Sequence, residues 1–113
     1  STPQNLHTAA TPTFAGLTLT GAFTYINGYI AKTTTYTAIS TDYTIDCTSG
    51  TFTVTFPTAV GIAGKIYVLK NSGAGVITGS GTSAQTFDGS ATITLAAGVS
   101  YTIQSNGANW III

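Results

Sequence analysis

The sequence has almost no charge. Of its 113 residues only three are Lys or Arg and three are Asp or Glu, and inspection shows no arginine and no glutamate. Ordinary domains carry about 25% charged residues, so this chain lacks the basic surface that nucleic acid or an anionic membrane would require. The longest apolar run is far shorter than the roughly 20 residues of a membrane span. We therefore expect no nucleic-acid partner and no membrane insertion.

Residues that carry reactive chemistry are equally scarce. Cys47 is the only cysteine and His7 the only histidine, which excludes an internal disulfide and leaves no cluster of metal ligands. The stretch YTIDC (43–47) predicts that Tyr43, Ile45 and Cys47 share one face, because side chains alternate along a strand, and that Cys47 is a small buried apolar residue. His7 lies in a polar leader segment, so we expect no pairing of this thiol with a histidine base.

Paired carboxylates would be the remaining route to glycoside hydrolysis. The acidic residues are Asp42, Asp46 and Asp88. Asp42 has the position of a turn residue, Asp46 lies on the outer face of its predicted strand, and Asp88 belongs to an Asp-Gly turn. We therefore expect no catalytic residue, no metal, no cofactor and no enzyme activity.

Threonine is abundant where charge is absent, with 24 copies. It is β-branched and fits a pleated strand, and its hydroxyl makes an outer face that is polar but uncharged. Helix signals are nearly absent, whereas short strand-like segments recur at 16–20, 23–26, 29–39, 43–47, 51–56, 65–70, 75–79, 84–87, 91–95, 99–104 and 109–113. Short strands at regular spacing predict an all-β fold, an antiparallel β-sandwich or small jelly roll.

Turn residues and apolar runs refine this prediction. Ser49-Gly50 predicts a short hairpin, and Asp88-Gly89 predicts a type I′ turn. The segment KIYVLK (65–70) is apolar on both faces, which predicts a central strand.

The composition changes near residue 30. We predict a leader or stalk remnant over residues 1–30 and a β-sandwich head domain over residues 31–113. A single strand is at best marginal in water, so the leader has to add to a sheet edge or meet the same strand of neighbouring chains. Because few lysines protect the sheet edges, we expect another subunit to cover them, in a homotrimer. The predicted trimer contacts are Phe14, Leu17, Leu19 and Phe23.

Several segments resemble one family. TPTFAGLTLTGA (11–22) is similar to the linker that recurs in bacteriophage tail-fibre and side-tail proteins. FPTAVGIAGKIYVLKNSG (56–73), DGSATITL (88–95) and SNGANWI (105–111) together resemble the C-terminal receptor-binding head domain of tail-fibre and other virion appendage proteins. The resemblance implies a homotrimeric all-β tip at the end of a fibre, on the virion or otherwise extracellular. It implies no fixed ligand residue.

Aromatic side chains are the binding chemistry that remains, because their ring faces stack on sugars. Tyr25, Tyr29 and Tyr36 lie near the junction of leader and head, either as packing or trimer contacts or as an exposed ligand site. Trp110 alternates with Ile112 and is either a packed side chain or a ligand platform. We expect non-enzymatic adhesion to a host cell-surface glycan or protein receptor. The alternatives are a structural trimerisation or capping module of a fibre and a carbohydrate-binding module of a secreted protein.

Overall fold

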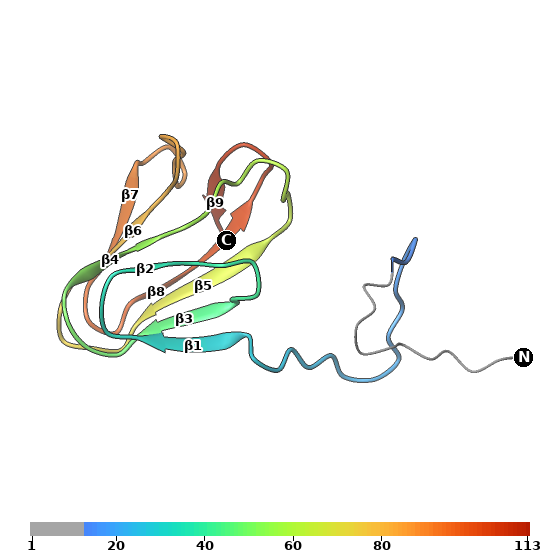
Figure 1. The fold of residues 1–113 in the computed structure, drawn as a ribbon, viewed down its shortest axis with the longest axis horizontal. Helices are drawn as coiled ribbons and strands as arrows, with labels where there is room; N and C mark the ends of the chain where they lie inside the picture. Colours follow the sequence, from blue (N-terminus) through green and yellow to red (C-terminus); the bar gives the residue numbers. More distant parts are fainter. Residues whose placement is uncertain (1–12) are drawn as a thin grey trace, which may run out of the picture.

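The structure, a computed structural model, describes residues 13–113. Within this range the chain forms nine strands and no helix, so none of the described segments is a helix that could cross a membrane. The strands form two facing sheets, and the segment before β1 extends away from one end of them (Figure 1). This extension contributes to the elongated dimensions of 56 × 28 × 25 Å.

Nearly all of the strands after residue 28 lie where the alternation of side chains predicts them. Their bounds are β1 (Tyr29–Lys32), β2 (Tyr36–Thr37), β3 (Thr44–Cys47), β4 (Phe52–Thr55), β5 (Ile66–Asn71), β6 (Ile77–Ser80), β7 (Thr92–Leu95), β8 (Ser100–Ser105) and β9 (Trp110–Ile112). The five-stranded sheet has the order β1-β3-β5-β8-β9, and the four-stranded sheet has the order β2-β4-β6-β7. β5 is therefore central, as its apolar sequence predicts.

Consecutive strands lie in opposite sheets through the first part of the head. The chain passes from β1 to β2, from β3 to β4 and from β5 to β6, and each of these three rungs contributes one strand to each sheet. The strands of successive rungs pair in parallel, whereas β7, β8 and β9 add antiparallel pairs. The all-β prediction is confirmed and the two sheets are compatible with a sandwich, but they are mixed rather than antiparallel. Parallel neighbours need a crossover connection, and here the strand of the opposite sheet supplies it.

The two predicted turns differ in outcome. The hairpin prediction at Ser49-Gly50 is wrong, because the flanking strands β3 and β4 lie in different sheets and the turn carries the chain between them. The prediction at Asp88-Gly89 is confirmed. Both of these residues have positive φ, 48° and 87°, as a type I′ turn requires, and the flanking Phe87 and Ser90 form an antiparallel bridge.

Four aromatic rings occupy the core between the sheets. Phe56 lies with its ring centroid 5.3 Å from that of Tyr67 and 6.0 Å from those of Phe87 and Trp110. All four side chains are buried, so they are shielded from water on every side within the single chain. The Phe56–Phe87 pair is edge-to-face, whereas Phe56 is tilted against Tyr67 and Trp110, and such aromatic pairs add to the hydrophobic free energy.

Two of the alternating segments show how sequence determines burial. In β4 Val54 is fully buried and Phe52 is half-buried. In β3 Ile45 and Cys47 are fully buried, as predicted for Cys47. Tyr43 precedes β3 and is 40% exposed, so it does not share their burial.

The outer face of the four-stranded sheet is covered by hydroxyl groups. The strand register joins Thr and Ser residues in two rows, Thr37, Thr55, Ser80 and Thr92 in one and Thr53, Thr78 and Thr94 in the other. This face is polar without charge, which is the role that the composition predicts for threonine.

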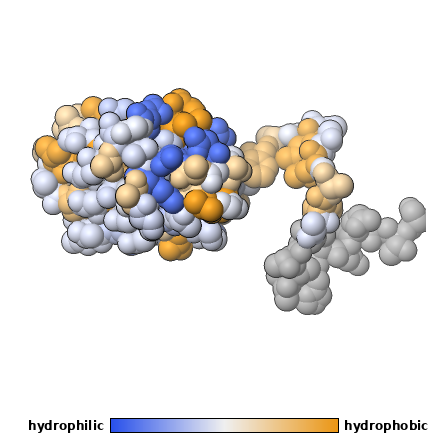
Figure 2. All heavy atoms as spheres, turned by 90° about the horizontal axis from the view of Figure 1, so that it is seen from above, coloured by the Kyte–Doolittle hydropathy of each residue, from blue (hydrophilic) through white to orange (hydrophobic). Residues whose placement is uncertain are grey.

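Residues 13–27, which precede β1 and belong to the predicted leader, are exposed along their whole length and form no strand within the single chain. Figure 2 shows apolar side chains along this extension beside the head. The exposed fractions of the predicted trimer contacts are 56% for Phe14, 70% for Leu17, 51% for Leu19 and 73% for Phe23. A strand that forms only between chains stays a prediction. Residues 1–12, including His7, lie outside the described residues.

Candidate binding site

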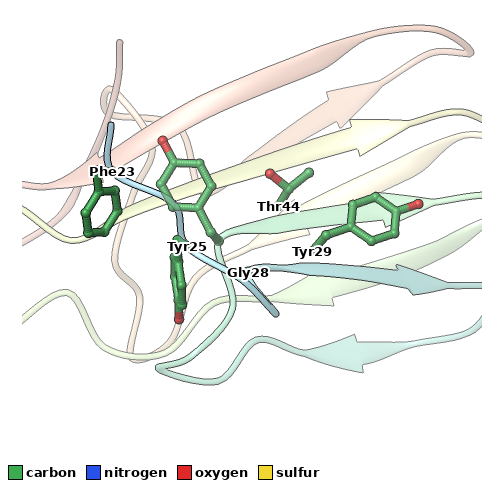
Figure 3. Close-up of a pocket in the computed structure, with 6 residues that line it drawn as sticks. Phe23, Tyr25, Gly28, Tyr29 and Thr44 are labelled. Carbon is green, nitrogen blue, oxygen red and sulfur yellow. The ribbon is translucent and has the colours of Figure 1, made fainter. Parts of the chain in front are cut away.

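The junction of leader and head forms a hollow of about 380 Å³. We call it the aromatic hollow, and its lining residues are Phe23, Tyr25, Gly28, Tyr29, Tyr43 and Thr44. Figure 3 shows Phe23 and Tyr25 on the leader side and Tyr29 and Thr44 on the strand side. The volume falls within the range of about 300–1,000 Å³ that is usual for small-ligand sites.

Tyr25 is held against the head by two contacts. Its hydroxyl donates a hydrogen bond to the backbone oxygen of Thr41. Its ring meets the ring of Tyr43 edge-on, with centroids 6.4 Å apart and planes at 76°. These contacts attach the leader to the head at Tyr25. The rings of Tyr25 and Tyr43 together form one corner of the hollow.

Gly28 lies where Tyr25 and Tyr43 come so close to the backbone that a side chain would be crowded. A Cβ atom at this position would lie 3.0 Å from Cδ2 of Tyr25 and 3.2 Å from Cβ of Tyr43. The backbone oxygen of Gly28 accepts hydrogen bonds from the N–H groups of Tyr43 and Thr44, at 2.9 and 2.7 Å. These bonds join the end of the leader to the start of β3, so the hollow has a fixed backbone.

Tyr29 stands on the edge strand β1 and is 60% exposed. Its hydroxyl donates a 2.7 Å hydrogen bond to Oδ2 of Asp46, and Ser72 Oγ donates a 2.6 Å bond to Oδ1 of the same carboxylate. The hydrogen bond to Asp46 is the main cause that raises the pKa of Tyr29 above its ordinary value. The carboxylate therefore fixes the direction of the ring at the edge of the hollow.

The aromatic hollow presents four ring faces and hydroxyl groups but no charged side chain. An aromatic face contacts the C–H groups of a sugar ring, while hydroxyl groups exchange hydrogen bonds with its O–H groups. A small number of polar groups in an apolar hollow is typical of sites that orient a neutral ligand. The arrangement suits stacking and hydrogen bonding to a neutral ligand.

Two of the four predicted ligand residues, Tyr25 and Tyr29, lie together in the aromatic hollow. Tyr36 lies elsewhere, on β2, where its hydroxyl donates to Oδ2 of Asp42 at 2.6 Å and the ammonium of Lys32 lies 4.2 Å from its ring centroid. Both neighbours hold the Tyr36 ring in place, so it does not line the hollow.

Trp110 is fully buried and packs against Phe56 and Tyr67. The interpretation as a ligand platform is therefore wrong for this residue, because its ring has no exposed face. The packed alternative is the one that the structure supports.

Tyr43 and Thr44 belong to the aromatic hollow but were not among the predicted residues. The parallel register of β1 and β3 pairs Tyr29 with Thr44, which brings the starts of both strands together. The sequence did contain a signal for Tyr43, because Tyr29 and Tyr43 each stand at the start of a predicted strand segment.

The Asp42 carboxylate and the Cys47 thiol are both enclosed by the fold. Asp42 is 4% exposed, and its Oδ2 also accepts a 2.9 Å hydrogen bond from the N–H of Ile39, closing the turn Ile39–Asp42. Burial raises the pKa of the Cys47 thiol to about 11, with Asp46 adding to the shift. Among residues 13–113, no three His, Cys, Asp or Glu side chains are grouped so that they could hold a metal ion.

Comparison with models of known protein families, with curated proteins and with solved structures found no match.

Proposed function

We propose that this chain is the non-enzymatic receptor-binding tip of a trimeric, phage-like tail fibre or virion appendage, and that it binds a neutral glycan on the host cell surface. The observation that supports this best is the aromatic hollow, which gathers four aromatic rings without a charged group at one end of the head. The resemblance of the sequence to fibre head domains supports the setting, on the virion and outside the cell.

Binding rests on short-range contacts. A sugar ring stacks on the rings of Tyr25 and Tyr43, and the hydroxyl of Thr44 forms a hydrogen bond with one of its O–H groups. A single site of this kind binds weakly. Three identical sites on one tip, and several fibres on one particle, raise the avidity by about two to four orders of magnitude without a new contact.

The trimer forms through the leader in this proposal. Leu17 and Leu19 are 70% and 51% exposed in the single chain, with Thr18 between them, so one face of this segment is apolar. Burying each such side chain between chains is worth about 1.5–3 kcal/mol. Equivalent leaders that meet at a symmetry axis would remove these side chains from water together.

The same observation favours a second candidate function, a structural module that trimerises or caps a fibre shaft. In that case the exposed leader is the functional surface and the aromatic hollow is filled by protein. A monomeric mass in solution would instead favour a carbohydrate-binding module of a secreted protein.

A glycan array probed with the full chain separates these functions. The proposal expects binding to a restricted set of neutral glycans, loss of that binding in Tyr43→Ala, and retention in Val76→Ala. Val76 is the matched control because it is 44% exposed but follows the turn at the other end of the sheets. An array with no bound glycan would contradict the glycan site and favour the structural module, whereas equal binding by Tyr43→Ala would show that the glycan site lies outside the aromatic hollow.

A further inference from the structure

A second hollow, of about 230 Å³, lies beside the turn Ile39–Asp42. Its wall is mostly apolar and includes Ala38, Ile39, Pro57, Ile62, Lys65 and Tyr67. Ile39 and Ile62 are 55% and 36% exposed, so they form an apolar rim that faces the solvent. The volume is smaller than that of an ordinary whole-ligand site, so it suits one substituent of a larger ligand.

Lys65 supplies the ammonium group of this second hollow, whose lining also includes the hydroxyl side chains of Ser40 and Thr58. Its ammonium lies 4.6 Å from the ring centroid of Tyr67 and donates to the backbone oxygens of Ser40 and Asp42, both at 2.9 Å. An ammonium has three N–H groups, and these carbonyls take two of them. One donor is therefore left for a ligand oxygen at the border of an apolar wall.

The charge of Lys65 is offset by the nearby Asp42. Asp42 is nearly fully buried, and its carboxylate opposes the lowering of the Lys65 pKa that burial causes. The two side chains together carry no net charge. A neutral acceptor such as an amide oxygen fits this environment better than an anion, which the buried carboxylate would repel.

The turn Ile39–Asp42 contributes to the wall of the second hollow and, through the backbone oxygen of Thr41, anchors Tyr25 of the aromatic hollow. Consecutive backbone oxygens of Ser40, Thr41 and Asp42 accept from Lys65, Tyr25 and Lys65 in that order. Consecutive Cα atoms are about 3.8 Å apart, so the anchor points of the two hollows lie within one turn of chain. An oligosaccharide of several sugar units is long enough to reach from one of these anchor points to the next.

We infer that the second hollow is a subsite for the acetamido group of an N-acetylated hexosamine, in the same glycan that the aromatic hollow binds. The methyl group packs on Ile39 and Ile62, and the carbonyl oxygen accepts a hydrogen bond from Lys65. The inference rests on the proposed function, because it names one sugar class among the neutral glycans. One apolar group in a fitted pocket changes affinity by about 10- to 200-fold.

Calorimetric titration of the full chain with N,N′,N″-triacetylchitotriose, called chitotriose below, and with cellotriose tests this subsite. The two sugars differ only in carrying an acetamido or a hydroxyl group on the ring carbon next to the anomeric carbon. We expect chitotriose to bind about tenfold more tightly or better. Ile62→Ser and Lys65→Met should both bring the affinity ratio close to one.

Lys70→Met is the matched control, because Lys70 also donates to a backbone oxygen, that of Gly98, but lies at the other end of β5. This variant should keep the preference. If Lys65→Met lowers the melting temperature, Ile62→Ser, at an exposed rim, still decides the question. Equal binding of both sugars by the wild type, or a preference that survives Ile62→Ser, overturns the subsite and leaves the proposed function standing. Failure of chitotriose to bind also overturns it, and the glycan array then decides whether another glycan is bound.

Discussion

The backbone oxygen of Gly50 lies in the space that a side chain on Gly75 would need, 2.2 Å from an ideal Cβ position. Gly50 belongs to the turn after β3 and Gly75 to the turn after β5, so the turns of successive rungs stack backbone against backbone. Asn71 is fully buried and secures this stack, since its Nδ2 donates to the oxygens of Gly75 and Leu95 at 2.8 and 2.9 Å.

Gly75→Ala should destabilise the head by about 1–3 kcal/mol, because the added methyl group meets backbone atoms that cannot turn away. Gly75 does not have positive φ, so the loss would report the clash rather than backbone strain. Gly21→Ala is the control, since a Cβ there meets nothing within 4 Å. Urea denaturation measures both free energies of unfolding. An unchanged value for Gly75→Ala would contradict the stacked turns.

The only tryptophan of the chain, Trp110, reports on the core. Its ring centroid lies 5.6 Å from that of Tyr67 and the side chain is fully buried. We expect blue-shifted emission that acrylamide quenches little, and no change in emission when a glycan binds. Trp110→Ala should cost about 3–5 kcal/mol, whereas the nearby and 59% exposed Ile113→Ala should cost little. Emission like that of the unfolded chain would place the indole outside the core.

Stability should fall in strong base. Burial is the main cause that raises the pKa of both Tyr36 and Tyr67 from 10.0 to about 12. Their folded-state pKa values exceed the unfolded ones, so this contribution is fully present below about pH 10 and is lost as the pH rises towards 12. Melting temperatures across this range test the prediction. Tyr36→Phe should start lower, because Asp42 loses a donor, but decline less steeply. A melting temperature that stays level up to pH 12 would exclude the shift.

Assembly should depend on one face of the leader. Light scattering at micromolar concentration should give three times the mass of the chain, and Leu17→Ser combined with Leu19→Ser should lower the mass or shift dissociation to higher concentration. Thr18→Ser combined with Thr20→Ser changes the opposite face and should leave the trimer intact. A folded wild-type monomer would refute the homotrimer. An intact trimer in the leucine variant would show that the interface lies in the head.

Strand positions were predictable because they depend on local alternation. Side chains in β4 follow the period of two that TFTVTF shows, and the type I′ turn at Asp88-Gly89 follows from its own two residues. Strand direction was not predictable in the same way. The turn at Ser49-Gly50 can reverse the chain within one sheet or carry it to the other, and the choice depends on packing against β5 and β6, which come later in the sequence.

The candidate site was predictable in part for the same reason. Tyr25 and Tyr29 are close in sequence and near the junction, so their proximity could be inferred. Tyr43 joins them only through the parallel pairing of β1 with β3, which is a non-local contact. The burial of Trp110 could not be predicted from its strand alone. Alternation with a period of two shows which side chains share a face, but not which face the rest of the fold covers.

The most direct test of the glycan-binding proposal is a calorimetric titration of a glycan selected on the array, at about 50 mM and about 500 mM NaCl, where screening of exposed charges differs strongly. We expect nearly equal affinities at both salt concentrations for the wild type, and a loss of affinity of at least about tenfold in Tyr43→Ala, or about 1.4 kcal/mol. A tenfold loss with salt in the wild type, or full affinity in Tyr43→Ala, would contradict an uncharged site in the aromatic hollow.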